Sequence, residues 1–203
     1  MRDLKRRRVL QILGATPAAA ALAFTESEAA QAAEQSQTAR RRAAAAGTAY
    51  KPKFFTPAEY ATIVALSDLI IPKDERSPSA SEVGTPEFVD HMVFNQPQRQ
   101  VGMRGGLVWL DTECTRRFNK PTFVACTDAE RRQVLDDIAW PAKAAPRFRN
   151  ASRFFSGVRD LVAGGFWSSK AGMADLGYQG NVPVGEWTGA PQNVLDKVGV
   201  KYE

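Results

Sequence analysis

The side chains that most often carry out chemistry are scarce in this sequence. It has a single histidine, His91, which follows Asp90, and two cysteines, Cys114 and Cys126. A general base needs a partner and a pocket, and the sequence shows neither for His91, so a surface or half-buried histidine is the favoured interpretation. A zinc site rich in histidine or cysteine, a cubane iron–sulfur cluster and a covalent C-x-x-C-H haem are all excluded for this chain alone.

Two other patterns resemble catalytic motifs only superficially. Glu130 and the pair 136–137 are carboxylates, but arginines 131–132 accompany them, which favours a charged outer face of a helix over an acid–base pair. The glycines of residues 102–106 lack both a preceding strand and the Gly-Lys-Ser/Thr ending of a phosphate-binding loop. The sequence therefore predicts no catalytic, cofactor-binding or metal-binding residue.

The two cysteines are the remaining reactive groups. Cys114 lies on the apolar stripe of an expected helix, and Cys126 directly precedes the start of the next helix at Thr127. An oxidising compartment would favour a disulfide between Cys114 and Cys126, which would add about 3 kcal/mol by closing a short loop. Two small buried thiols are the alternative.

Residues 51–203 are predicted to form an all-α domain, a compact bundle of about five helices. Thr56 followed by Pro57 and Glu59 is a capping box that starts the first helix, and Ile71-Pro72 ends it. Apolar residues then recur at helical spacing with no strand-like alternation. The expected helices cover residues 56–71, 85–97, 98–119, 127–140 and 151–163, with a short one at 192–198.

The segment 164–191 has a different composition, rich in glycine and aromatic residues and poor in periodicity. We expect it to be long and irregular. Trp167, Tyr178 and Trp187 argue against disorder, because such large side chains need a surface to cover them. The segment either wraps its own helical domain or lies on another protein, where Tyr and Trp are favoured anchors.

The N-terminus has the order of an export signal, which is basic, then apolar, then small. A weakly apolar stretch at 12–24 is followed by Ala30-Gln31-Ala32, a small-x-small cleavage site. We expect residues 1–32 to be a twin-arginine signal peptide; a disordered basic N-terminus with an Ala-rich helix is the alternative. The residues that carry the signal are Arg6, Arg7, Val9 and Leu10.

Residues 33–50 are polar and alanine-rich, so they are predicted to be a disordered tether. The net charge of the whole chain is only +5, and the basic residues concentrate in the signal and the tether. A role in nucleic-acid binding is therefore not expected. The sequence contains no apolar run long enough for an ordinary transmembrane helix.

Several stretches resemble the gluconate 2-dehydrogenase subunit 3 family. They are FFTPAEY at 54–60, ALSDLIIP at 65–72, GTPEFVD at 84–90, and FWSSKAGMADLGYQGN at 166–181 followed by WTG at 187–189. Together with the predicted helices, the resemblance implies a rigid body that binds a partner through its C-terminal segment. The residues expected to contact the partner are Phe166, Trp167, Lys170, Leu176, Tyr178, Asn181 and Trp187.

The resemblance further implies a non-catalytic small subunit of a periplasmic sugar or sugar-acid dehydrogenase complex. The expected partners are a large FAD-dependent subunit of the glucose–methanol–choline type and a c-type cytochrome. FAD and haem c would then be held by those subunits and not by this chain, which would meet the inner membrane only through the complex. A transient periplasmic chaperone or binding module, or an independent periplasmic enzyme, are the alternatives.

Overall fold

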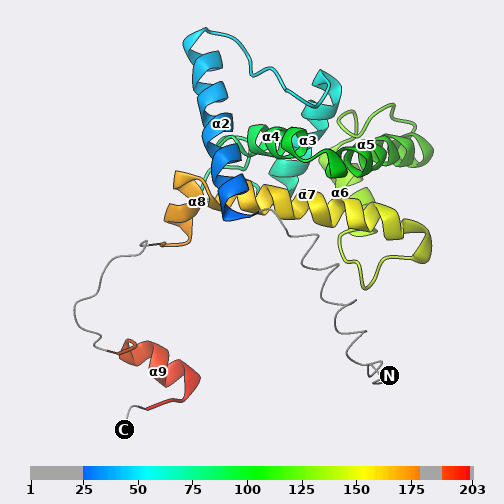
Figure 1. Ribbon diagram of the computed structural model, residues 1–203. Helices are drawn as coiled ribbons and strands as arrows, with labels where there is room; N and C mark the ends of the chain where they lie inside the picture. Colours follow the sequence, from blue (N-terminus) through cyan, green and yellow to red (C-terminus); the bar gives the residue numbers. More distant parts are fainter. Residues whose placement is uncertain (1–24, 179–188, 202–203) are drawn as a thin grey trace, which may run out of the picture.

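The computed structural model describes residues 25–178 and 189–201 (Figure 1). These residues form helices and connecting segments with no strand, which confirms the prediction of an all-α bundle. None of the described helices has an apolar stretch long enough to cross a membrane. The helices are α2 (Glu26–Ala45), α3 (Pro57–Ile70), α4 (Thr85–Asn95), α5 (Pro97–Phe118), α6 (Asp128–Asp136), α7 (Arg149–Trp167), α8 (Lys170–Asp175) and α9 (Gln192–Val198), with a 3-10 turn at Pro146–Phe148.

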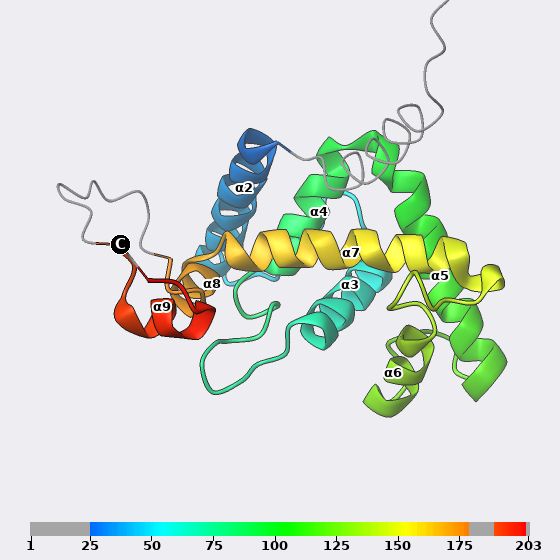
Figure 2. The same ribbon diagram turned by 90° about the horizontal axis from the view of Figure 1, so that it is seen from below.

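Helix α4 lies at the centre of the bundle, although it is one of the shorter helices. It packs against α2, α3, α5 and α7, and every residue from Thr85 to Val93 is buried. Figure 2 shows α7 running across the molecule, with α8 at one end and α5 crossing near the other. The helices that surround α4 thus leave both ends of α7 at the surface.

The capping box predicted from the sequence begins α3, and a second capping box begins α6. At α3, the Glu59 backbone N–H donates to Thr56 Oγ1 (3.3 Å) and the Thr56 N–H donates to the Glu59 carboxylate (2.8 Å). Thr127 and Glu130 make the same pair of bonds at the start of α6. Because each cap satisfies two backbone donors that the helix leaves free, it fixes the residue at which the helix begins.

The expected disordered tether is wrong for most of its length. Residues 26–45 form α2, which a capping box between Thr25 and Glu28 begins. Ala32 and Ser36 are buried where the helix packs on α4. Small side chains let two helices approach closely, so an alanine-rich sequence that looks unable to order itself gains its stability from the neighbouring helix.

The glycine-rich start of the C-terminal segment is also more regular than expected. Helix α7 continues through Gly164 and Gly165 to Trp167, and α8 follows at once. A Cβ atom on Gly165 would lie 2.7 Å from the Phe88 ring and 3.1 Å from Thr85 on α4. The glycine therefore serves the close packing of α4 on α7 and does not end the helix.

Cys114 and Cys126 are two buried free thiols, so the expected disulfide is not formed in this structure. The side chains are nevertheless neighbours. Burial, together with a hydrogen bond to Cys126, raises the pKa of the Cys114 thiol to about 12. A thiol with so high a pKa is a poor nucleophile at neutral pH, because the thiolate is the reactive form.

Candidate partner-binding surface

Large apolar side chains are exposed where α7 ends and α8 follows. Trp167, in the last turn of α7, is 41% exposed, and Leu176 and Tyr178, just after α8, are each 62% exposed. Lys170, the first residue of α8, is exposed as well. We call these four residues the α8 surface. Exposed aromatic and apolar residues that lie close together in the chain are typical of an interface.

The structure places the other residues of the expected interface differently. Phe166 is only 1% exposed and belongs to the core, so it is not a contact residue for a partner. The Phe166 ring packs edge to face against the Trp167 ring, with the centroids 5.8 Å apart. This contact helps to hold the exposed indole in position. Asn181 and Trp187 lie outside the described residues.

Helix α8 is short, and local hydrogen bonds define both of its ends. The Gly172 N–H donates to Ser169 Oγ (3.0 Å) at the start. At the other end, Gly177 has a φ of +65°, and the Tyr178 N–H donates to the carbonyl of Met173 (3.0 Å), which is a Schellman motif. This turn fixes the direction in which the chain leaves the helix at Tyr178.

Helix α8 also lies directly on the end of α7. A Cβ atom on Gly172 would come within 2.1 Å of the Phe166 carbonyl oxygen, so no larger residue fits there without movement of the backbone. The close contact of Gly172 with the Phe166 backbone therefore fixes α8, and with it the α8 surface, to the end of α7.

A loop between α3 and α4 supports α8 from the other side. Arg76 donates to the Asp175 carbonyl (2.7 Å) and pairs with the Asp175 carboxylate (3.0 Å). The loop presents Arg76 through an Asx turn, in which Asp74 accepts from the backbone N–H groups of Ser77 and Arg76. Those two bonds lower the pKa of Asp74, because they favour its charged form.

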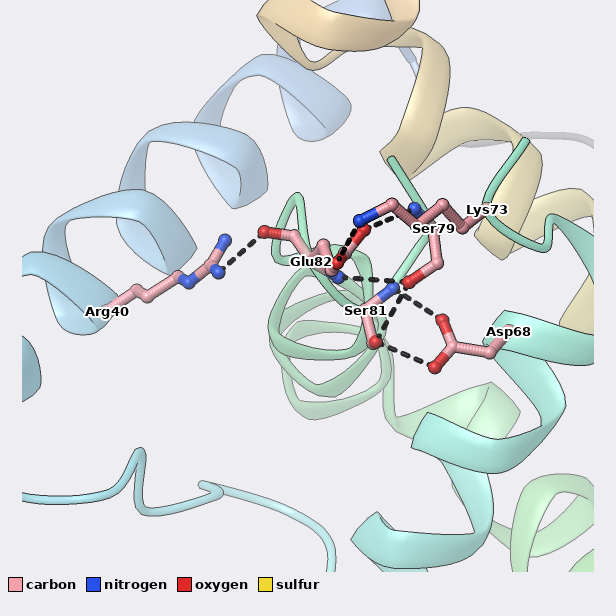
Figure 3. Close-up of polar contacts among 6 residues, drawn as sticks. All are labelled: Arg40, Asp68, Lys73, Ser79, Ser81 and Glu82. Atoms are coloured by element: carbon pink, nitrogen blue, oxygen red, sulfur yellow. Dashed lines mark hydrogen bonds and ion pairs between the residues drawn. The ribbon is translucent and has the colours of Figure 1, made fainter. Parts of the chain in front are cut away.

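The same loop is anchored to the body at its other end (Figure 3). Asp68 on α3 accepts from the Ser81 N–H (2.9 Å) and hydroxyl (2.7 Å). Glu82 accepts from the Ser79 N–H (2.9 Å), and its carbonyl accepts from Arg40 of α2 (2.7 Å). Helices α2 and α3 thus anchor this loop, and the loop in turn binds α8. The α8 surface is therefore part of the rigid body.

A buried polar cluster in α4 was not anticipated from the sequence. The Asp90 carboxylate, fully buried, accepts from the Tyr50 hydroxyl (2.7 Å) and from the backbone N–H groups of Lys53 (2.7 Å), Phe54 (3.0 Å) and Phe55 (3.1 Å). Burial, together with the bond to Asp90, raises the pKa of Tyr50 well above its ordinary value. The cluster ties the chain before α3 to α4.

His91 is fully buried, and not at the surface or half-buried as the sequence suggested. Its Nδ1 donates to the Glu87 carbonyl one turn earlier (2.9 Å), since a carbonyl can only accept. Within the described parts of the chain, no three His, Cys, Asp or Glu side chains gather as a metal site. Among the described residues, the Asp90 carboxylate and His91 Nδ1 are thus used in hydrogen bonding, whereas the buried His91 Nε2 has no hydrogen-bond partner.

The fold and surface define a class of protein: an all-α body that carries an exposed apolar end on a rigid support. The family model described as gluconate 2-dehydrogenase subunit 3 matches residues 57–189, which include α3 to α8. The chain belongs to this family, and the resemblance found in the sequence is confirmed. A search of curated proteins and a search of solved structures gave no significant match.

Proposed function

We propose that this chain is the non-catalytic small subunit of a periplasmic FAD-dependent sugar or sugar-acid dehydrogenase complex. It supports the export, assembly and stability of a large flavoprotein of the glucose–methanol–choline type. That subunit holds FAD, and a c-type cytochrome subunit holds haem. The family name, which describes one subunit of a dehydrogenase, supports the existence of such partners.

The observation that carries this proposal is the α8 surface. Trp167, Leu176 and Tyr178 are partly exposed, although covering their remaining apolar surface would be favourable by about 25 cal/mol per Å². Their support is rigid, so little conformational freedom is lost when a partner covers them, and the gain from burial is kept as affinity. The interface is therefore preorganised for a protein partner.

The first test replaces the α8 surface and measures complex formation. We expect the triple variant Trp167→Ala, Leu176→Ala, Tyr178→Ala to lose most of the flavoprotein that co-purifies with the wild-type chain from a co-expressing strain. Bound flavin, measured by its absorbance, should fall in parallel.

A matched control separates lost contact from lost folding. Trp140 is 63% exposed and lies between α6 and α7 in the chain, outside the α8 surface, so Trp140→Ala removes an exposed indole of the same kind. It should leave the yield of complex unchanged. An unchanged yield of complex in the triple variant would reject the α8 surface as the interface.

The second test concerns export. If this chain carries its partner through the twin-arginine pathway, replacing Arg6 and Arg7 with lysines should leave both subunits in the cytoplasm. Fractionation followed by immunoblotting of each subunit measures this outcome. Periplasmic flavoprotein in the double variant would contradict carriage by this chain.

A further inference from the structure

A groove lies toward the opposite end of α7 from the α8 surface. It is a groove of about 610 Å³ between α5 and α7, at the place where the two helices cross in Figure 2. Its apolar walls come from Met103 and Trp109 on α5 and from Phe154 and Leu161 on α7. The groove is therefore separate from the surface assigned above to the flavoprotein.

Three glycines open this groove with no packing reason among the described residues. A Cβ atom on Gly102, Gly105 or Gly157 would meet nothing within 4 Å. By contrast, a Cβ on Gly106 or Gly165 would strike a phenylalanine ring, so those two glycines are required by the fold. A glycine inside a helix costs about 1 kcal/mol relative to alanine, and nothing in the described structure offsets this cost for the first three.

The residues of the groove have the spacing of two helix faces. On α5, the lining positions 102, 105, 106 and 109 follow the i, i+3, i+4, i+7 rule; on α7, positions 150, 153, 154, 157, 160 and 161 do the same. Where α5 and α7 cross, these two faces line one groove. An amphipathic helix can place its apolar face in a groove of this kind.

The polar groups of the groove indicate the charge of the occupant. Arg99 and Arg153 line it, and Arg153 has no ion-pair partner among the described residues. The one acidic residue in the lining, Asp160, lies 3.8 Å from the guanidinium of Arg159. The Ser156 side chain also lines the groove, and its buried hydroxyl has no hydrogen-bond partner among the described residues.

We propose that this groove binds an amphipathic α-helix of a partner protein. The apolar face of that helix lies on the floor at Gly105 and Gly157, and acidic residues beside it pair with Arg99 and Arg153. The basic charge of the rim disfavours the chain's own N-terminal segment, which contains the arginines at 6–8. The proposal holds whichever subunit the α8 surface contacts.

The test uses the full chain and two labelled synthetic peptides of 18 residues. Both peptides carry leucine at i, i+3, i+4 and i+7; one is flanked by glutamates and the other by lysines. We expect fluorescence anisotropy to show saturable binding of the glutamate peptide, at least tenfold tighter than that of the lysine peptide and weakened by salt. Equal binding of both peptides, or binding of neither, would overturn the proposal.

Filling the groove gives the decisive variants. Gly105→Leu and Gly157→Leu place a side chain in open space, so they should keep the helical circular dichroism spectrum and weaken the glutamate peptide at least tenfold. Val101→Leu is the matched control, because Val101 is 84% exposed on the same helix outside the groove. Wild-type affinity in both glycine variants would refute the groove as the site.

Reversing the charge tests the orientation of the occupant. Arg153→Glu should lower the preference for the glutamate peptide and raise affinity for the lysine peptide. Two other outcomes would assign the groove to a different occupant and so overturn the proposal. In the first, the wild-type chain dimerises in sedimentation experiments while the Gly105→Leu variant stays monomeric. In the second, decanoate binds saturably to the wild-type chain, does not bind to Gly105→Leu, and displaces neither peptide.

Discussion

Asp90 shows how one residue organises a segment distant in the sequence. Its carboxylate is fully buried yet accepts four hydrogen bonds, three of them from consecutive backbone N–H groups at 53–55. A buried carboxylate is stable only when its hydrogen-bonding capacity is used in this way. The position of the chain that leads into α3 therefore depends on a single side chain of α4.

Replacing Asp90 should be among the most damaging single changes in the chain. Asp90→Ala leaves several buried donors without an acceptor, so we expect it to lower the free energy of unfolding by about 3 kcal/mol. Tyr50→Phe removes only one of the four bonds and should cost about 1 kcal/mol. Urea denaturation followed by circular dichroism measures both; equal midpoints for Asp90→Ala and the wild type would show that water replaces the carboxylate.

The sequence could not reveal this cluster. Asp90 and His91 stand in a short apolar helix, where a polar pair looks like a surface feature. The partners of the carboxylate are Tyr50 and the backbone at 53–55, which lie 35 to 40 residues away in the chain, and backbone donors have no signature in the sequence. Only the packing of α4 at the centre of the bundle brings the groups together.

At the level of the helices, the same residue type has opposite roles at two places in α7. Gly165 allows α4 to approach, because a Cβ there would lie 2.7 Å from the Phe88 ring. Gly157 faces the open groove, where a Cβ meets nothing. The two positions therefore form a natural pair for a comparison within one helix.

We expect Gly165→Ala and Gly157→Ala to change stability in opposite directions. Gly165→Ala forces α4 and α7 apart and should cost about 1–3 kcal/mol of unfolding free energy. Gly157→Ala relieves the intrinsic penalty of glycine and should gain up to about 1 kcal/mol. Thermal melts of the two variants provide the comparison, and a stabilised Gly165→Ala would contradict the close packing of α4 on α7.

Most helices could be predicted from capping boxes and apolar periodicity, and the exceptions have identifiable causes. The capping box of α2 is present in the sequence as Thr25 and Glu28, but the alanine-rich composition after it indicated a tether. The glycines at 164–165 indicated the end of a helix, whereas Gly165 is a packing contact. Both features depend on the tertiary position of α4, which local patterns do not encode.

At the scale of the whole molecule, Arg40 connects the N-terminal helix to the centre and to the loop that supports α8. Its guanidinium lies 3.8 Å from the Glu87 carboxylate of α4 and donates to the Glu82 carbonyl. A Cβ on Gly84 would come within 2.8 Å of that guanidinium, so the loop, α2 and α4 meet at one point. Helix α2 is therefore a structural part of the body.

The contribution of α2 can be measured by comparing two chains. A chain of residues 25–203 keeps the Thr25 cap and the buried Ala32, and a chain of residues 33–203 loses both. We expect the shorter chain to be less stable by about 1–3 kcal/mol, from the lost cap and the lost apolar contact. Urea midpoints measure the difference, and identical midpoints would show that the first turns of α2 contribute nothing.

If the chain is exported as proposed, the position of Ala32 has a consequence for its maturation. The small-x-small sequence at 30–32 lies inside a capped helix that is docked on α4, and the Ala32 side chain is fully buried. A chain exported already folded would present this bond to a peptidase as helix, whereas proteolysis requires the local chain to open. Hydrolysis after Ala32 would then require the first turns of α2 to unfold. The fraction of chains in which these turns are open would therefore set the rate of cleavage.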